Sequence, residues 1–226
     1  MTRLEIRNMA RKRLGETTGS FWTDAELNGW INEAGEDCAF KSKSIRANYY
    51  FNTVADQLEY SLSTVLPLAS SILDLYVKIS GTTWRRMLPL ANREEFDMEY
   101  EGWMNANAAA PYRYYWDREE DKLYLYPKPD ATNAGTQYAR AYCTKKFTLI
   151  TNDSTTPDLP DPLHLAMVDW VVALGYETRG YGDKANDAYA KYGARISSYR
   201  TERQREKEDD EIIMKPNYGV GTRRWR

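Results

Sequence analysis

The sequence predicts an α+β fold that is mainly α: a small helical bundle with a β-rich insertion and an extended C-terminal arm. Three patterns lead to this prediction: apolar residues at helical spacing near both ends, alternating residues in the middle, and no regular period after residue 200. We expect the bundle to comprise 1–44 and 160–200, the insertion 45–150, and the arm 201–226. Two N-terminal and two C-terminal helices would form the bundle, because short connections favour antiparallel neighbours.

The first helix is predicted to begin at a capping box. Thr2 and Glu5 have the spacing at which a hydroxyl and a carboxylate each accept a hydrogen bond from a free backbone N–H. The helix should run to about Leu14 and end at Gly15. Basic residues dominate its surface, so we expect either a solvated face or an anion-binding one. These residues are Arg3, Arg7, Arg11, Lys12 and Arg13.

The second helix has the same kind of start. Thr23 and Glu26 form another capping box, and apolar residues then recur on one helical face. A helix over about 24–42 follows. Its apolar face comprises Leu27, Trp30, Ile31, Ala34 and Cys38.

The middle of the chain changes to the period of a β-strand. Alternating residues and aromatic runs predict several short strands, and a charged turn at 117–121 predicts a hairpin between two of them. Pro127 and Pro129 should end that hairpin, because proline cannot donate to a sheet ladder. The expected strands are 58–62, 73–79, 84–90, 112–116, 122–126 and 137–147, with one helix over 92–103.

Two more helices are expected after a proline-containing loop. Asp161 would cap the first of them, with Pro162 at the first helical position, where a missing N–H costs nothing. Apolar stripes over 163–174 and 185–199 are separated by a glycine-containing break, so the two helices should pack antiparallel.

Composition excludes two broad classes of protein. The chain has 226 residues with 31 Lys+Arg against 33 Asp+Glu, and a net charge of −2 lacks the basic footprint of a dedicated nucleic-acid binder. No run approaches the roughly 18 apolar residues of a membrane helix. The 18 Tyr and 7 Trp suit either surfaces buried against another chain or a tyrosine-rich sheet face.

No arrangement of residues points to an enzyme or to a cofactor. The single histidine, His164, has no cluster of metal-ligating residues around it in the sequence, so we expect it at the surface or at a helix start. The glycines do not form a phosphate-binding loop. Cys38 and Cys143 lie far apart and are expected to be reduced packing residues.

The C-terminal arm has anchors but no period. After residue 200 the helical stripe gives way to charged residues, and Pro216 with two following glycines prevents one regular element. Such a segment is expected to fold onto a partner chain, the alternative being that it docks on its own domain. The candidate contact residues are Ile212, Ile213, Tyr218, Arg223, Arg224, Trp225 and Arg226.

Four segments carry a family resemblance. They are FWTDAELNGWINEA at 21–34, ADQLEYSL at 55–62, LYLYPKP at 123–129 and LPDPLH at 159–164. In this order and spacing they resemble the head-to-tail adaptor (connector) proteins of tailed bacteriophages, especially those with short tails. The resemblance covers about residues 2–200, and its motifs mark a fold rather than a catalytic site.

The resemblance implies a structural virion protein without enzymatic activity or cofactor. Such proteins form a homo-oligomeric ring, usually of twelve subunits, between portal and tail, with a C-terminal arm that contacts the portal. It implies a place at the head–tail junction after assembly in the host cytoplasm. The expected partners are the portal protein, a tail tube or nozzle protein and the double-stranded genomic DNA that passes through the channel during ejection; no membrane is expected.

Two alternatives remain open from the sequence. One is another head-completion or tail-completion connector, which would share the fold and differ in its position in the virion. The other is a DNA-binding module that uses the basic first helix and the terminal arginines.

Overall fold

The computed structural model describes residues 1–16, 21–100 and 102–214, with side chains described as far as Arg205. The chain divides into two compact units. A helical unit contains Met1–Ser42 and the chain from Thr148 onward, and a β unit contains Lys43–Phe147.

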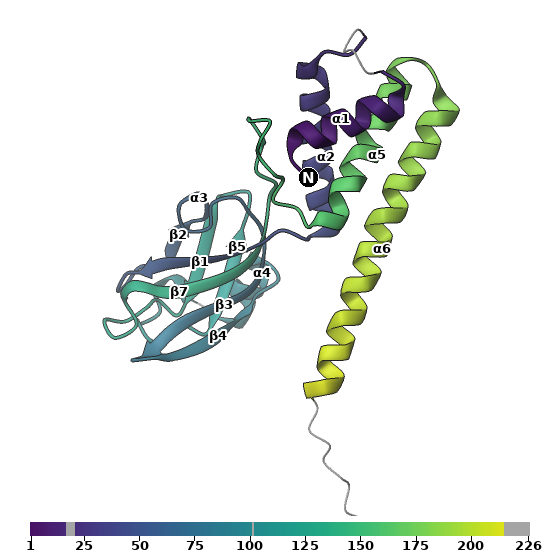
Figure 1. The fold of residues 1–226 in the computed structure, drawn as a ribbon. Coiled ribbons are helices and arrows are strands. Elements are labelled where there is room, and N and C mark those ends of the chain that lie inside the picture. The colour runs from purple at the N-terminus through teal and green to yellow at the C-terminus, as the bar shows by residue number, and fades with distance from the viewer. Residues whose placement is uncertain (17–20, 101, 215–226) are drawn as a thin grey trace, which may run out of the picture. The chain divides into compact units, whose positions relative to one another are not determined.

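Four helices build the helical unit: α1 (Arg3–Leu14), α2 (Asp24–Ser42), α5 (Asp161–Thr178) and α6 (Gly182–Met214). Helix α5 is central, because it packs against each of the other three (Figure 1). Its sequence explains this position, since most of its residues are apolar and most of its buried residues are apolar as well. The core residues include Ile6, Leu27, Ile31, Leu163, Met167 and Val171.

The predicted helix starts of α1 and α2 are confirmed. Thr2 and Glu5 form the reciprocal capping box, and Gly15 ends α1 with φ of 72° in the left-handed region that glycine tolerates. At α2, the Thr23 hydroxyl accepts from the Glu26 N–H at 3.2 Å while the Glu26 carboxylate accepts from the Thr23 N–H at 2.7 Å.

The start of α5 lies one residue earlier than predicted. Pro160 is the cap and makes no side-chain hydrogen bond, and Asp161 is already the first helical residue. The prediction of Asp161 as cap was wrong because Pro160, with φ of −57° and ψ of 144°, is the last non-helical residue, so that it takes the cap position. Helices α5 and α6 then run antiparallel (Figure 1), with the Trp170 ring packed edge-on against Tyr189 and Tyr192.

The β unit is one seven-stranded sheet in the order β1-β7-β3-β4-β5-β6-β2. All neighbouring strands pair antiparallel except β4 and β5, which are parallel. The strands are β1 (Arg46–Thr53), β2 (Glu59–Ser61), β3 (Ala69–Ser80), β4 (Thr83–Pro89), β5 (Arg113–Asp117), β6 (Lys122–Tyr126) and β7 (Gly135–Lys145). A one-turn helix, α3 (Leu62–Val65), follows β2.

The sheet encloses its own apolar core on one side. Strand side chains alternate between the two sides, so every second residue points into this core. Its members include Phe51, Leu75, Val77, Met87, Leu123, Leu125, Ala139 and Ala141. We call this the inner face of the sheet.

A second, smaller aromatic core lies on the outer face at β5 and β6. There α4 (Arg93–Glu99) and the 3₁₀ helix η1 (Trp103–Asn105) cover the strands. Phe96 is fully buried and contacts the rings of Trp103, Tyr115 and Tyr126. The single helix predicted over 92–103 is therefore shorter, because α4 ends at Glu99 and Tyr100 leaves the helical conformation.

The predicted fold class was wrong. The β part is a curled, half-barrel, seven-stranded mixed sheet, and it is too large for the fold to be described as a mainly helical bundle with an insertion. The sequence patterns missed β1, whose pairing with β7 extends the sheet beyond the strands that were expected. Short strands become a large sheet only through such long-range pairing, which local patterns do not record.

Candidate functional site

The arginines on one face of α1 are buried inside the helical unit. Arg3, Arg7 and Arg11 are each less than 10% exposed. The guanidinium groups of Arg3 and Arg7 both pair with the Asp153 carboxylate, at 2.7 and 2.8 Å. Arg11 pairs with the buried Glu16 at 3.1 Å, and with the more exposed carboxylate of Asp24 at 2.8 Å.

This burial overturns the expectation for α1. The helix presents these three arginines neither to solvent nor to an external anion, because the carboxylates of Glu16, Asp24 and Asp153 neutralise them. It also removes the surface on which the DNA-binding alternative partly relied. The terminal arginines, the other part of that alternative, lie outside the described residues.

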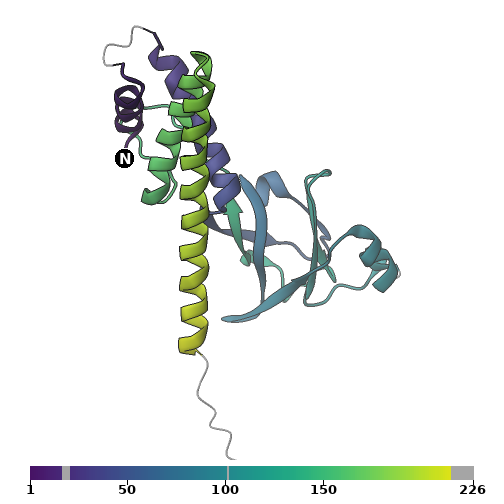
Figure 2. The ribbon, with the colours of Figure 1, turned by 90° about the vertical axis from the view of Figure 1, so that its right-hand side faces the viewer.

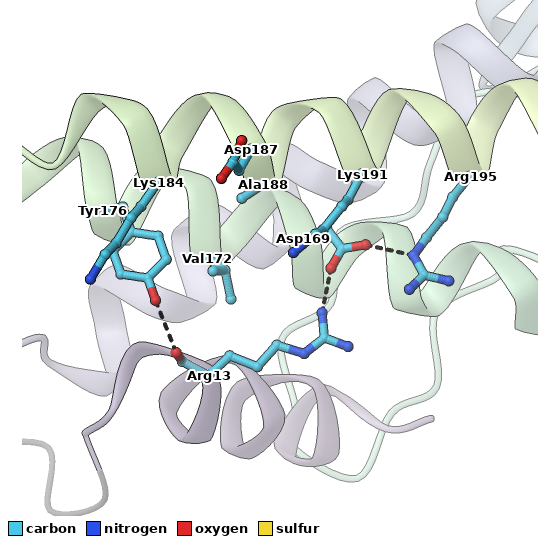
Figure 3. Close-up of a pocket in the computed structure, with 9 residues that line it drawn as sticks. All are labelled: Arg13, Asp169, Val172, Tyr176, Lys184, Asp187, Ala188, Lys191 and Arg195. Atoms are coloured by element: carbon cyan, nitrogen blue, oxygen red, sulfur yellow. Dashed lines mark hydrogen bonds and ion pairs between the residues drawn. The ribbon is translucent and has the colours of Figure 1, made fainter.

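A second ion-pair cluster joins α1, α5 and α6 (Figure 3). The Asp169 carboxylate is 3% exposed and accepts hydrogen bonds from Arg13 of α1 and, at 2.5 Å, from Arg195 of α6. The Tyr176 hydroxyl donates to the backbone carbonyl of Arg13 at 3.2 Å. One buried carboxylate thus links three helices.

A groove of about 530 Å³ lies over this cluster. Its α6 wall carries Lys184, Asp187 and Lys191. The guanidinium groups of Arg13 and Arg195 both pair with the Asp169 carboxylate. This arrangement suits the holding of α1 and α6 against α5.

Sequence reasoning missed Asp169, although a signal was present. The residue stands in the run Met167-Val168-Asp169-Trp170-Val171, where the helical stripe is otherwise apolar. A carboxylate in such a stripe must find a cation once the stripe is buried. The sequence does not say which of the distant basic residues supplies it.

His164 was predicted at the surface or at a helix start. It lies in the first turn of α5, and its side chain is buried. Its Nδ1 lies 2.9 Å from the amino group of Met1, and its Nε2 lies 3.0 Å from the Leu159 carbonyl oxygen. Burial lowers the pKa of His164, with the nearby amino group adding to the effect. The ring is a neutral packing residue that ties the chain start to α5.

The two cysteines are buried and free, which confirms the prediction of packing residues. Burial raises the pKa of each thiol to about 12, so neither is a nucleophile near neutral pH. Among the described residues, no group of His, Cys, Asp and Glu could hold a metal ion. In that same part of the chain, no helix has the length and apolar content to cross a bilayer.

The candidate arm residues fall at and beyond the end of α6. This helix has 33 residues, so it is about 50 Å long at roughly 1.5 Å per residue. Ile212 and Ile213 lie in its last turn, where only the backbone is described. The other candidates, Tyr218, Arg223, Arg224, Trp225 and Arg226, lie outside the described residues.

Helix α6 continues past the other helices of its unit (Figure 2). Among the side chains that the structure describes, the last buried one in α6 is Ile196. From Ser197 to Arg205 every side chain is exposed or half-buried, and the backbone stays helical to Met214. The stretch Ser197–Arg205 therefore contributes no buried side chain to a core.

Comparison with known families accounts for both units. The model of the SU10 adaptor protein family matches residues 1–214, which include the helical unit to the end of α6 and the whole β unit. A comparison with curated proteins gives no match. The SU10 family is one of phage head–tail adaptors, for which a structural rather than an enzymatic role is implied, and the chain belongs to this family.

Proposed function

We propose that this adaptor forms a ring, of twelve subunits, between the portal and the tail, and that the ring joins head to tail and extends the DNA channel. Membership of the adaptor family supports association with portal and tail components at the head–tail junction. Assembly takes place in the host cytoplasm before the virion is complete. The observation that carries the proposal is the half of α6 beyond Ile196.

A long helix that packs little against its own domain is expected to be stabilised by contact with a partner protein. In α6, residues 197–205 bury little against the rest of the helical unit, and the sequence from Arg200 to Glu211 is densely charged. A charged helix of this kind is soluble while exposed, and its end can carry apolar anchors to another protein. We assign it the role of the arm that reaches the portal.

The end of the arm has the residue types of an interface hot spot. Trp, Tyr and Arg dominate binding energies at protein interfaces. The proposed portal contacts are Ile212, Ile213, Tyr218, Arg223, Arg224, Trp225 and Arg226. The β unit would then serve contacts with the tail tube or nozzle protein and with neighbouring subunits.

The charge of the chain suits passage of DNA rather than its retention. Each phosphate contact adds salt-dependent affinity, so a channel that held the duplex tightly would oppose ejection. The net charge of the chain is −2, and the buried arginines of α1 form ion pairs with carboxylates of the same chain. A wall made of such subunits offers little for the phosphates to bind.

Truncation tests the role of the arm. A chain that ends after Asp210 should keep its circular dichroism spectrum and melting temperature, because it loses no described core residue, and it should no longer pellet with portal particles. A chain that ends after Met214 keeps Ile212 and Ile213 and separates their contribution from that of the last residues. Full portal attachment by the shorter chain would refute the arm.

A point substitution gives a finer measurement. Trp225→Ala should weaken portal attachment by about 1–3 kcal/mol if the ring is a buried anchor. Electron microscopy of portal incubated with the wild-type chain should show a twelvefold ring. A chain that remains monomeric and never joins portal would contradict the proposed function as a whole.

A further inference from the structure

The outer face of the sheet is covered at one end and open at the other. At β5 and β6 it is covered by α4 and η1. On β1, β7, β3 and β4 the outward side chains other than Thr144 are exposed or half-buried, while most of their alternating neighbours point into the inner core. We call these four strands' outward side chains the open face.

The open face is built from aromatic rings and cations. One row crosses all four strands, because the backbone register places Tyr50 beside Arg140, Arg140 beside Tyr76, and Tyr76 beside Arg86. The other aromatic members are Trp84, Tyr138 and Tyr142, and the other charged members are Lys78 and Asp74.

Arg140 lies at the centre of this face. Its guanidinium carbon is 4.7 Å from the Tyr142 ring centre, 5.2 Å from that of Tyr76 and 5.5 Å from that of Trp84. Within the described residues, its Nε has no hydrogen-bond partner. The rings fix the side chain in place and leave its charge without a buried carboxylate.

The other charges of the open face also favour an acidic partner. Lys78 lies 4.8 Å from the Tyr138 ring centre. Arg86 pairs with Asp74 at 2.5 Å, yet its side chain remains 61% exposed. With Arg140 included, three cations stand against one carboxylate among these residues, so the face is positive.

The same unit carries a surface of the opposite character on α4. This helix has the sequence REEFDME, in which four acids stand against Arg93. Glu94 and Glu99 are exposed, and the side chain of Met98 on the same helix is 85% exposed. An exposed methionine on an acidic helix is suited to contact with aromatic rings beside cations.

We propose that the open face of one subunit binds the α4 surface of a second copy. This inference rests on the proposed ring, and it names one of its subunit contacts. The charges are complementary, Met98 supplies an apolar anchor, and Tyr, Trp and Arg are the residues that dominate interface energies. Because the two surfaces differ, the contact is heterologous, which is the kind that closes into a ring.

An aromatic and cationic sheet face can also stack on single-stranded nucleic acid. Two features favour the protein partner here. The ring faces of Tyr76, Trp84 and Tyr142 are already directed at the guanidinium of Arg140. Asp74 on the same face would repel phosphates.

The first test reverses the charge of each surface in the full-length chain. A face variant carries Lys78→Glu and Arg86→Glu, and a surface variant of α4 carries Glu94→Lys and Glu99→Lys. Portal is titrated with each chain, and the bound copies are counted by native mass spectrometry. We expect each variant to lose cooperative filling of the portal and to need at least about tenfold more protein for half-occupancy.

The matched control is Arg85→Glu. Arg85 is exposed on the same strand as Arg86, but it pairs with the buried Val77 and so belongs to the inner side of the sheet. Its charge reversal should leave portal filling unchanged. Melting temperatures of all variants within a few degrees of wild type establish that each one folds.

Mixing the two variants gives a sharper result. The native α4 of the face variant complements the native open face of the α4 variant, and the two reversed surfaces complement each other as well. At a concentration where neither variant alone fills the portal cooperatively, the mixture should therefore recover cooperative filling, with the two variants bound in equal numbers. A chain that carries all four substitutions has both charges reversed and should recover cooperative filling.

The outcomes separate this inference from the proposed ring. If the wild-type chain forms no ring on portal, the proposed function fails. If the wild type forms a ring and the face variant forms the same ring at the same concentration, the ring stands and this contact is refuted. Binding of single-stranded DNA that is lost in the face variant, with ring formation intact, would also refute it.

Discussion

One group of arginines in the helical unit and one group in the β unit have opposite surroundings. In the helical unit, Arg3, Arg7 and Arg11 are buried and paired with carboxylates. In the β unit, Arg140 is held by aromatic rings and Arg86 is mostly exposed. The comparison teaches that basic residues in a sequence do not mark a binding surface by themselves. Their function depends on whether the fold supplies carboxylates for them.

The largest expected effect comes from breaking a buried pair in the helical unit. Arg11→Met leaves the Glu16 carboxylate buried without its cation, which should lower the free energy of unfolding by about 3–5 kcal/mol. Urea denaturation followed by tryptophan fluorescence measures the loss. Adding Glu16→Gln should recover most of it, because the buried charge is then gone as well. A loss below about 1 kcal/mol in the single variant would show that the pair is not structurally important.

The next largest loss of stability is expected where α5 approaches α1 closely. A Cβ on Gly175 of α5 would lie 2.7 Å from a methyl carbon of Leu14 on α1, so the Leu14 side chain or α1 itself would have to shift. Gly175→Ala should therefore cost about 1–3 kcal/mol of stability by overpacking. Gly193→Ala on α6 is the control, because a Cβ there meets nothing within 4 Å. Equal stability of the two variants would contradict the packing seen at α1.

Acid pH should weaken the helical unit through Asp153. Hydrogen bonds from Arg7 and then Arg3 hold the pKa of this carboxyl below its ordinary value of 3.8. A lowered folded pKa stabilises the fold above the unfolded pKa, and this stabilisation is lost as the pH falls through the folded pKa. Asp153→Asn should lower the melting temperature at pH 7, and the difference from wild type should shrink below about pH 4. A difference that does not change with pH would contradict this origin.

The smallest change in the free energy of unfolding is expected from a substitution on the open face of the sheet. Arg86→Ala removes an ion pair whose arginine is 61% exposed, and such surface pairs contribute about 0–1 kcal/mol. The same chemical denaturation should therefore find nearly wild-type stability, in contrast to Arg11→Met. A loss as large as that of Arg11→Met would erase the difference between the two units.

Local signals correctly predicted where α1 and α2 begin and where α1 ends. The capping boxes at Thr2 and Thr23 placed the starts of α1 and α2, and Gly15 placed the end of α1. Side chains within four residues of each other decide these features, so they can be read from a short segment. The boundaries predicted for the bundle, the insertion and the arm stay a prediction, because no folding of the separate parts has been measured.

Pairings between distant segments could not be predicted. Arg3 and Asp153 are 150 positions apart, and β1 pairs with β7 across most of the β unit. The open face did leave a local trace, because Tyr138, Arg140 and Tyr142 alternate with Ala139, Ala141 and Cys143. That pattern indicates a strand with one apolar and one aromatic side, but it does not say whether another element covers the aromatic side.

The sequence by itself determined where α1 and α2 begin, that an amphipathic helix passes into a charged one near residue 200, and that the middle of the chain forms strands. Only the tertiary structure decided that the sheet is large, which arginines are neutralised, and which aromatic side chains stay open. Local conformation follows from neighbouring residues, whereas burial and charge neutralisation follow from residues that meet only when the chain folds.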